Sequence, residues 1–333
     1  MFATREYVIS ELLKTKDFIS GEKLSEALGM SRAAINTAVK ALRSEGYDIT
    51  SVTNKGYKLV NKPDFLTAGE LLSLLPESRM QTVTVLPEVD STNKRLKEMA
   101  FEGAPEGSVV VSDHQSAGRG RLGRSFLSPQ GKGIYLSYLL RPASTPSEIS
   151  TVTCRAAVAT CEAIKNVCGE YPSIKWVNDL QINSMKICGI LTEMSIEPEI
   201  GCVSNVIIGI GINVNEDPSD FPEELQSIAS SIKHELGATV PISRSAITSE
   251  LIKELDKLRA GWPSEHDYYL SKYKELCSTV GLDLNVLPVG NPDPSLIRQA
   301  KAIGISDNFA LEVEFADGHT ELLSSGEVSV RRR

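Results

Sequence analysis

The segment GRGRLGR, residues 118–124, places three glycines and three arginines in seven positions, shortly after the apolar run VVV at 109–111. Glycine lets backbone N–H groups approach an anion closely, and the arginine guanidinium offers planar, permanently charged donors to phosphoryl oxygens. The segment therefore predicts a loop that binds a phosphate compound.

The same segment fits the pattern G-x-G-x-x-G, but its surroundings do not fit a dinucleotide-binding fold. In that fold the turn opens a helix, and an acidic residue follows about 20 positions later. Here residues 125–133 predict a loop, residues 134–140 (IYLSYLL) predict a strand, and Arg141 is basic. An NAD site is therefore disfavoured. The other alternative to a phosphate-binding loop is a solvated loop that binds no ligand.

Length and composition favour a globular protein of two or three domains. The chain has 333 residues, of which 41% are hydrophobic and 23% are charged. It contains no run of about 18 apolar residues and no basic-then-apolar leader, so we expect a cytoplasmic protein without membrane insertion.

The cysteines and histidines do not predict a metal or redox site. None of the six cysteines forms a C-x-x-C pair, and the four histidines are scattered. Cys154, Cys161 and Cys168 recur every seven residues, which predicts small buried thiols on one face of a helix.

The first 62 residues carry ten Lys/Arg and seven Asp/Glu, a net charge of +3, whereas the remainder carries 25 and 36, a net charge of −11. Ser20 is placed to cap a short helix that Gly29 ends, and Ser31 is placed to cap a helix over residues 32–44. Apolar residues line the inner face of this last helix. Helix, tight turn and helix predict a helix-turn-helix.

Two alternating strands follow the second helix, at 47–52 and 56–60, and predict a wing. Arg43, Lys55 and Lys58 then become candidates for DNA phosphates, and polar outer residues of the helix become candidates for base edges or phosphates. The full candidate DNA-binding set is Ser31, Arg32, Ala33, Asn36, Thr37, Lys40 and Lys55. A protein-docking or purely structural module is the alternative.

Three more segments place polar groups beside apolar strands. DSTN at 90–93 opens a helix, so its side chains either cap that helix or face a ligand. KWVND at 175–179 precedes KICGILTE at 186–193, in which Lys186 needs an anionic partner such as Asp179 or a ligand. In IIGIGINVN at 207–215 the glycines predict a close approach to the strand.

Together these segments, with QSAGRGRLGR and a terminal GEVSVR, resemble the bifunctional biotin protein ligases that double as biotin operon repressors. The resemblance implies a multi-domain α/β fold. It consists of a winged helix-turn-helix at 1–63, a class II tRNA-synthetase-like mixed sheet at 64–280 and an SH3-like β-barrel at 281–333. The strand patterns at 285–289, 299–305 and 310–315 agree with that barrel, and residues 242–276 are expected to be largely helical.

The resemblance also implies roles for individual residues. The implied biotin-binding residues are Ser91, Thr92, Asn93, Gln115, Gly118, Arg119, Gly120, Arg121, Lys186 and Gly189. The implied nucleotide-binding residues are Arg121, Phe126, Asn178, Lys186, Asn213 and Arg331, with Glu327 supporting the last domain. The implied catalytic residues are Arg119, Arg121, Lys186 and Asp179.

The implied reaction uses ATP and biotin as substrates with Mg²⁺, and it transfers biotin to a lysine of the biotin carboxyl carrier protein of acetyl-CoA carboxylase. A homodimer of the adenylate-bound protein would bind operator DNA. The chain departs from the family at Val177, where proline is frequent, and at Phe126, where tryptophan is frequent. We identify no adenine-stacking side chain and expect aliphatic groups such as Ile228 or Ala229 there. A lipoate-type protein ligase and a repressor with a non-catalytic ligand domain are the alternatives.

Overall fold

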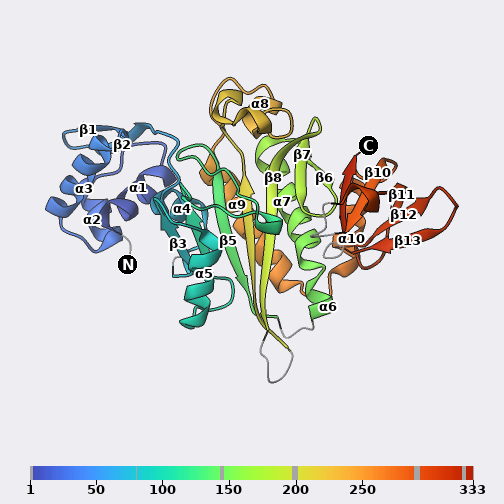
Figure 1. The fold of residues 1–333 in the computed structure, drawn as a ribbon. Coiled ribbons are helices and arrows are strands. Elements are labelled where there is room, and N and C mark those ends of the chain that lie inside the picture. The colour runs from blue at the N-terminus through green and yellow to red at the C-terminus, as the bar shows by residue number, and fades with distance from the viewer. Residues whose placement is uncertain are drawn as a thin grey trace.

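The computed structural model describes residues 3–79, 81–142, 146–196, 202–288, 293–324 and 328–332. Three parts follow one another along the chain: helices with a two-stranded sheet, a seven-stranded sheet with helices, and a five-stranded sheet. Figure 1 shows the seven-stranded sheet in the middle with the other two parts on opposite sides of it. The molecule is therefore elongated.

The N-terminal part contains the predicted helix-turn-helix and wing. Its elements are α1 (Thr4–Lys14), α2 (Gly21–Leu28), α3 (Arg32–Ser44), β1 (Asp48–Val52) and β2 (Gly56–Asn61). The Ser20 hydroxyl accepts a hydrogen bond from the Lys23 N–H at 3.1 Å, and the Ser31 hydroxyl accepts one from the Ala34 N–H at 3.2 Å. Gly29 ends α2 with φ of 62°. Both predicted caps and the predicted turn glycine are confirmed.

A separate hydrophobic core holds this part together. Its buried side chains come from the inner faces of the helices and from the first strand: Val8, Ile9, Leu12, Leu24, Ile35, Ala38, Val39, Leu42, Tyr47 and Ile49. The Arg43 guanidinium donates to the Ile49 carbonyl at 2.8 Å and to the Ser51 hydroxyl at 2.6 Å. In this structure Arg43 thus ties the wing to α3.

The short helix α4 (Ala68–Leu74) links the N-terminal part to the central part. It packs against α1, where a Cβ atom on Gly69 would lie 2.5 Å from the Glu6 carbonyl oxygen. The Glu6 carboxylate accepts the Gly69 N–H at 2.6 Å. Glu70 is buried and pairs with Lys62, and it also accepts the Ser245 hydroxyl at 2.7 Å. Polar contacts therefore cross the junction between the two parts.

The central sheet has the strand order β3-β4-β5-β9-β8-β7-β6. Its strands are β3 (Val83–Leu86), β4 (Val109–Ser112), β5 (Ile134–Leu140), β6 (Ser173–Lys175), β7 (Asp179–Ile182), β8 (Met185–Ile196) and β9 (Val203–Ile212). β3 pairs with β4 in parallel, and the other neighbouring strands pair antiparallel. The sheet is therefore mixed, as expected.

Alternate residues of the central strands point to opposite faces, and helices cover both faces. On one face Val110, Leu139 and Ile207 pack against α5 (Thr92–Phe101). On the other face α7 (Val152–Cys168) and α9 (Arg244–Ala260) pack against the sheet and against each other. Because α5 covers only part of its face, the rest of that face is available for a site.

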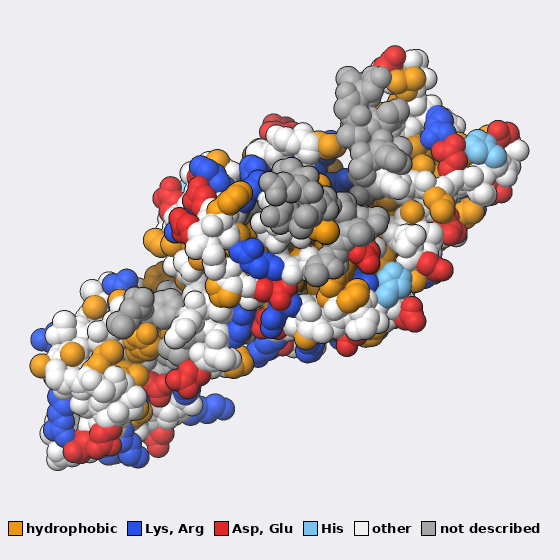
Figure 2. Space-filling model, turned by 90° about the horizontal axis from the view of Figure 1, so that it is seen from below, with side chains coloured by type: hydrophobic (Ala, Val, Ile, Leu, Met, Phe, Trp, Pro, Cys, Tyr) orange, Lys and Arg blue, Asp and Glu red, His pale blue; other side chains and the backbone are white. Residues whose placement is uncertain are grey.

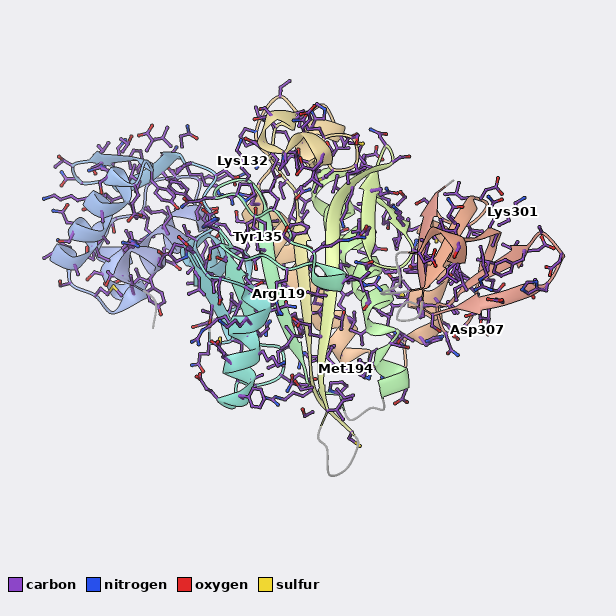
Figure 3. The ribbon with its side chains drawn as sticks, in the orientation of Figure 1. Arg119, Lys132, Tyr135, Met194, Lys301 and Asp307 are labelled. Atoms are coloured by element: carbon purple, nitrogen blue, oxygen red, sulfur yellow. The ribbon has the colours of Figure 1, made fainter. Side chains whose placement is uncertain are left out.

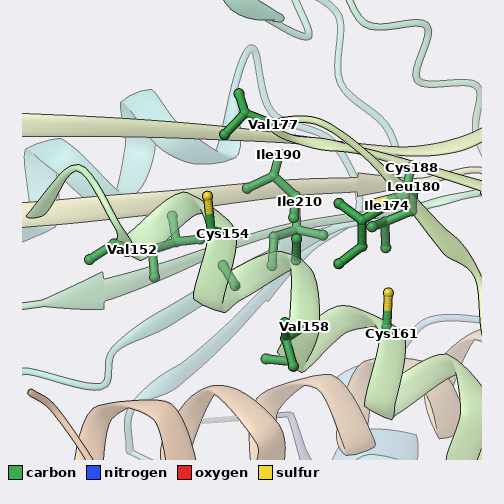
Figure 4. Packing of buried hydrophobic residues seen from close by; sticks show 14 of the residues in the cluster. Val152, Cys154, Val158, Cys161, Ile174, Val177, Leu180, Cys188, Ile190 and Ile210 are labelled. Carbon is green, nitrogen blue, oxygen red and sulfur yellow. The ribbon is translucent and has the colours of Figure 1, made fainter. Parts of the chain in front are cut away.

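The three regularly spaced cysteines lie on α7. Cys154 and Cys161 are buried among aliphatic side chains of the sheet (Figure 4), and Cys168 is half-buried. Burial raises the pKa of the Cys154 thiol to about 12, so this thiol stays protonated at neutral pH. All six cysteines are free of disulfides. Within the described ranges, no group of three or more His, Cys, Asp or Glu side chains is arranged to hold a metal ion.

Residues 242–276 form two helices, α9 and α10 (His266–Leu276), separated by a turn that contains Pro263. Proline lacks the N–H that an uninterrupted helix would need there.

The shorter helices are α6 (Pro146–Ile149), α8 (Ile232–Glu235), η1 (Glu77–Arg79), η2 (Arg121–Gly123), η3 (Pro218–Asp220), η4 (Glu223–Leu225) and η5 (Pro294–Leu296). Among the described residues, no helix has the length and apolarity needed to cross a membrane.

The C-terminal part is an antiparallel sheet with the order β13-β12-β11-β10-β14. Its strands are β10 (Asp283–Pro288), β11 (Arg298–Ile305), β12 (Leu311–Phe315), β13 (Thr320–Leu323) and β14 (Val328–Arg332). The Trp176 indole N–H donates to the Phe309 carbonyl at 3.0 Å and joins this sheet to the central part. Glu327 lies outside the described residues, and so does the side chain of Arg331.

Glu216 is predicted to make the stability of the protein depend on pH. Its side chain is 1% exposed, its carboxylate oxygens have no hydrogen-bond partner among the described residues, and burial raises its pKa to about 7. Between about pH 4.5 and 7 the folded state therefore binds more protons than the unfolded state. The free energy of unfolding should fall as the pH rises through this window.

Glu216→Gln resembles the protonated acid and removes this titration. We expect the variant to be more stable than the parent protein by about 2 kcal/mol at pH 8, with little difference at pH 4.5. Urea denaturation at several pH values measures this, with the exposed Glu98→Gln as control. A parallel pH dependence in the parent and Glu216→Gln would contradict the prediction.

Candidate active site and nucleic-acid interface

The candidate site lies on the face of the central sheet that α5 covers, where β8 and β9 carry glycines. Gly189 pairs with Gly211, and Leu191 pairs with Gly209. A Cβ atom on Gly209 would lie 2.2 Å from the Asn93 Oδ1, and one on Gly211 would lie 2.5 Å from Cε1 of Phe126. Side chains from α5 and from the loop after β4 thus rest directly on the strand. The predicted close approach to these glycines is confirmed.

A small cavity opens above this floor. It is lined by Ser91, Thr92, Asn93, Gln115, Arg119, Phe126, Gly189, Leu191, Gly209, Ile210 and Gly211. Six of the residues predicted to bind biotin are among them: Ser91, Thr92, Asn93, Gln115, Arg119 and Gly189. The fold therefore gathers into one pocket residues that lie about 100 positions apart in the sequence.

Hydrogen bonds fix the polar wall of this cavity. The Thr92 N–H and hydroxyl donate to the Gln115 Oε1 at 2.9 and 3.1 Å, and the Gln115 amide donates to the Ser128 hydroxyl at 3.1 Å. Ser91 precedes α5 but makes no capping hydrogen bond with its side chain, so its hydroxyl is not committed to the helix end. The wall presents oriented donors and acceptors suited to a small polar ring.

A larger cavity of about 560 Å³ adjoins the small one and shares Arg119, Phe126, Gly189 and Leu191 with it. Its other lining residues come from the loop after β4, from β6 to β8 and from the segment before α8: Gly120, Arg121, Leu122, Arg124, Ser125, Lys175, Trp176, Val177, Asn178, Asp179, Lys186, Ile190 and Ile228. One ligand could thus extend along the sheet through both cavities.

Three of the cations that line the larger cavity each lie beside an oxygen acceptor. Lys186 Nζ is 2.7 Å from Asp179 Oδ1, one of the two partners expected for it. Arg121 donates to Asn178 Oδ1 at 2.9 Å, and burial lowers the pKa of its guanidinium. Arg119, labelled beside the central sheet in Figure 3, is paired with a carboxylate of β8. The larger cavity is therefore lined by cationic side chains, two of which are paired with carboxylates.

The remaining candidate residues lie around the cavities in different ways. Gly118 is buried outside the lining of both cavities, and its carbonyl accepts the Phe126 N–H at 2.9 Å. Asn213 also lies outside both linings, and its amide donates to the Ser230 carbonyl at 3.0 Å. Ile228, an expected aliphatic contact for adenine, is 57% exposed and lines the larger cavity.

Three residues of the site were missed by the sequence analysis. Ser128 orients Gln115, Ser137 lies 2.8 Å from the Thr92 hydroxyl, and Glu193 pairs with Arg119 at 2.7 Å. Glu193 follows Gly189 and Leu191 at every second position, so alternation along the strand placed it on the site face. Ser128 and Ser137 carry no comparable local signal.

The outer face of α3 is the candidate nucleic-acid interface. The predicted DNA-binding residues Ser31, Arg32, Ala33, Asn36, Thr37, Lys40 and Lys55 are all exposed. Figure 2 shows both basic and acidic side chains on the end of the molecule that carries this part, and Arg32 lies 3.3 Å from Glu22. The face is accessible, and its charge is mixed.

Comparison with known proteins gives consistent matches. Residues 85–213 match the model of the biotin/lipoate A/B protein ligase family, and residues 4–58 match that of an HTH domain. The bifunctional ligase/repressor BirA of Bacillus subtilis (strain 168) is 36% identical over 93% of this chain and 93% of its own length. BirA of Escherichia coli (strain K12) is 30% identical over 96% of this chain and 95% of its own.

Among solved structures, the biotin protein ligase from Aquifex aeolicus in complex with biotin and ATP is similar to this chain. The TM-score is 0.63 at 28% identity, and the match covers 76% of this chain and 100% of that one. The likeness therefore concerns the fold of the greater part of the molecule.

Proposed function

The chain belongs to the family of bifunctional ligase/repressor proteins named BirA, and from that premise we propose its two activities. As a ligase it joins biotin to AMP with ATP and transfers biotin to a lysine of the biotin carboxyl carrier protein. As a repressor it binds operator DNA in response to biotin. The observation that carries the proposal is the pair of adjoining cavities over a glycine floor, with cationic side chains lining the larger one.

In this proposal the small cavity holds the biotin ring. Ser91, Thr92 and Gln115 hydrogen-bond the ring system, and Asn93 supports this wall. The backbone at Gly118 and Arg119 closes over the tail, and Gly189 lets the tail pass along the sheet. The biotin carboxylate then points toward the larger cavity.

The larger cavity takes the nucleotide. Arg121 and Lys186 face the α-phosphate, Asn178 positions Arg121, and Phe126 covers the ligand where the two cavities meet. The adenine rests on aliphatic groups that include Ile228. Asn213 contributes by bracing the segment that carries Ile228, through its hydrogen bond to Ser230. Arg331 approaches the nucleotide phosphates from the C-terminal part.

Adenylation brings the biotin carboxylate and the α-phosphate of ATP together. Because both groups are anions, cationic side chains are needed to stabilise their approach. A carboxylate oxygen of biotin attacks the α-phosphorus of ATP, the bond to the bridging oxygen breaks, and pyrophosphate leaves. Arg119, Arg121 and Lys186 stabilise the negative charge that develops, in a site from which the loop at 118–124 excludes water.

Transfer opens the mixed anhydride. An unprotonated lysine amine of the carrier attacks the acyl carbon, an amide forms, AMP leaves with its phosphate oxygen, and the amine gives up one proton. We assign Asp179 to orienting the reacting groups, because its carboxylate already lies against Lys186 in the larger cavity.

The metal in this reaction is Mg²⁺. Since the described residues offer no cluster of three or more metal-ligating side chains, they do not fit a resident metal site. We therefore propose that Mg²⁺ enters as part of the Mg·ATP substrate.

We further propose domain boundaries and a location in the cell. The domains are a winged helix-turn-helix at 1–63, a class II tRNA-synthetase-like catalytic domain at 64–280 and an SH3-like domain at 281–333. The separate core of the N-terminal part supports the first boundary. We propose a cytoplasmic location, because the proposed carrier protein and operator DNA are both cytoplasmic.

Repression would depend on the same intermediate. Biotinyl-adenylate orders the loop at 118–124, the ordered loop promotes a homodimer, and the dimer presents two copies of α3 to the operator. Carrier protein competes for the same surface.

Pyrophosphate release tests the ligase activity. The protein should release pyrophosphate from Mg·ATP with biotin, and then label a carrier domain with biotin. Lipoate is the matched control, because the matching family model also includes lipoate ligases. Release with lipoate only would identify a lipoate ligase, and release with neither acid would leave a non-catalytic ligand domain.

Footprinting tests repression. Biotin with ATP should increase protection of the operator, and Lys40→Ala should weaken binding at all sequences and lower the salt slope by about one. Lys97→Ala, an exposed change on α5, is the control. Protection that does not respond to biotin and ATP would refute the coupling.

A further inference from the structure

Glu193 contacts two of the residues that line the small cavity, Asn93 and Arg119, and has no part in the proposed chemistry. It follows Gly189 and Leu191 along the site face of β8, and it pairs across the sheet with Ile207. Its side chain is 29% exposed, so it lies at the rim and not in the core.

One oxygen of Glu193 joins the two walls of the cavity. Its Oε2 accepts from the Asn93 amide at 2.7 Å and from the Arg119 guanidinium at 2.7 Å. Asn93 is itself held in place, because it rests on Gly209 and its Oδ1 lies 2.5 Å from the Ser137 hydroxyl. Glu193 is thus fixed on the rigid side of the site.

Arg119 belongs to the opposite, loop side of the site. Within the loop, backbone hydrogen bonds link Gly120 to Arg124 and Gly118 to Phe126, so the turn is locally closed. The contact from Arg119 to Glu193 spans 74 residues and attaches this turn to β8. A charge-assisted contact of this kind holds the guanidinium at one place and orientation.

We propose that Glu193 is a positioning residue that holds Arg119, and with it the loop at 118–124, over the small cavity. This inference rests on the proposed ligase function. Without the carboxylate, Arg119 loses its anchor on the sheet, and the loop covers the reactive intermediate less of the time. The main consequence is faster escape of biotinyl-adenylate, with adenylation itself less affected.

The variant Glu193→Gln removes the negative charge of the side chain and keeps its shape. Glutamine keeps the volume and an oxygen that accepts from Asn93, but it removes the negative charge that Arg119 needs. We expect the half-life of pre-formed biotinyl-adenylate to fall by about five- to tenfold, and the KM for biotin to rise by a similar factor. The kcat for pyrophosphate release should fall by a smaller factor than the half-life, because Arg121 and Lys186 still stabilise the developing charge. Glu193→Asp, which keeps the charge, should recover part of the half-life.

Two comparisons make the test specific. Glu98→Gln removes a carboxylate from an exposed pair with Arg95 on α5 and should leave the half-life unchanged. In a background of Arg119→Gln, adding Glu193→Gln should shorten the half-life no further. Thermal denaturation should show the same midpoint for Glu193→Gln as for the parent.

The outcomes against the inference are distinct from those against the ligase proposal. The inference is overturned if Glu193→Gln retains the adenylate as long as the parent. It is also overturned if Glu193→Gln shortens the half-life equally with and without Arg119. A parent protein that forms no adenylate would overturn the ligase proposal, and the inference with it.

Discussion

Replacing Lys186 by methionine should lower the rate of biotin-dependent pyrophosphate release by about 100- to 1000-fold, the usual effect of removing one preorganised charge donor. Lys186 Nζ faces the larger cavity, 2.7 Å from Asp179, and a Cβ atom on Gly189 would lie only 3.3 Å from it. Methionine keeps the aliphatic stem and removes the charge. Biotin binding by the small cavity should persist, since Lys186 does not line it.

Lys132→Met is the matched control. Lys132 has a similar exposure and a carboxylate partner, Asp220 at 2.9 Å, but it lines neither cavity. The double variant Lys186→Met/Asp179→Asn removes the unpaired carboxylate and tests whether the loss is only structural. Recovery of the rate in that double variant would show that Lys186 serves Asp179 and not the reaction.

Local features of the N-terminal part and of the strands were predictable because they depend on near neighbours. Ser20, Ser31 and Gly29 act through residues three or four positions away, and the strand at 134–140 is largely apolar. The glycines at 209 and 211 also predicted a close approach without indicating what approaches.

Long-range pairs could not be predicted in the same way. The side chains on those glycines, Asn93 and Phe126, come from elements about 115 and 85 positions away, and strand order alone brings them there. Glu193 shows the same limit, because its strand periodicity indicates a face but not the arginine opposite. The pair of Lys186 and Asp179 was easier to anticipate, because the two residues lie seven positions apart on the neighbouring strands β7 and β8.

Arg244 is a second long-range case, because all of its partners lie more than 100 positions away in the sequence. Its side chain is fully buried at the start of α9 and donates to Asp64 Oδ2 at 2.9 Å and to Asp113 Oδ1 at 2.6 Å. It also donates to the carbonyls of Asp64 at 2.6 Å and Gly133 at 3.1 Å. Although burial alone would lower the pKa of Arg244, its two carboxylates raise it. One guanidinium thus joins the segment leading from the N-terminal part, the end of β4 and the start of β5.

Arg244→Met should therefore lower the free energy of unfolding by about 3–5 kcal/mol, because it leaves two partly buried carboxylates without their cation. Urea denaturation followed by circular dichroism and by tryptophan fluorescence measures the change. Lys253→Met on the same helix removes a partly exposed pair with Glu250 and should cost less than about 1 kcal/mol. Equal urea midpoints for Arg244→Met and Lys253→Met would show that the buried cluster does not stabilise the junction.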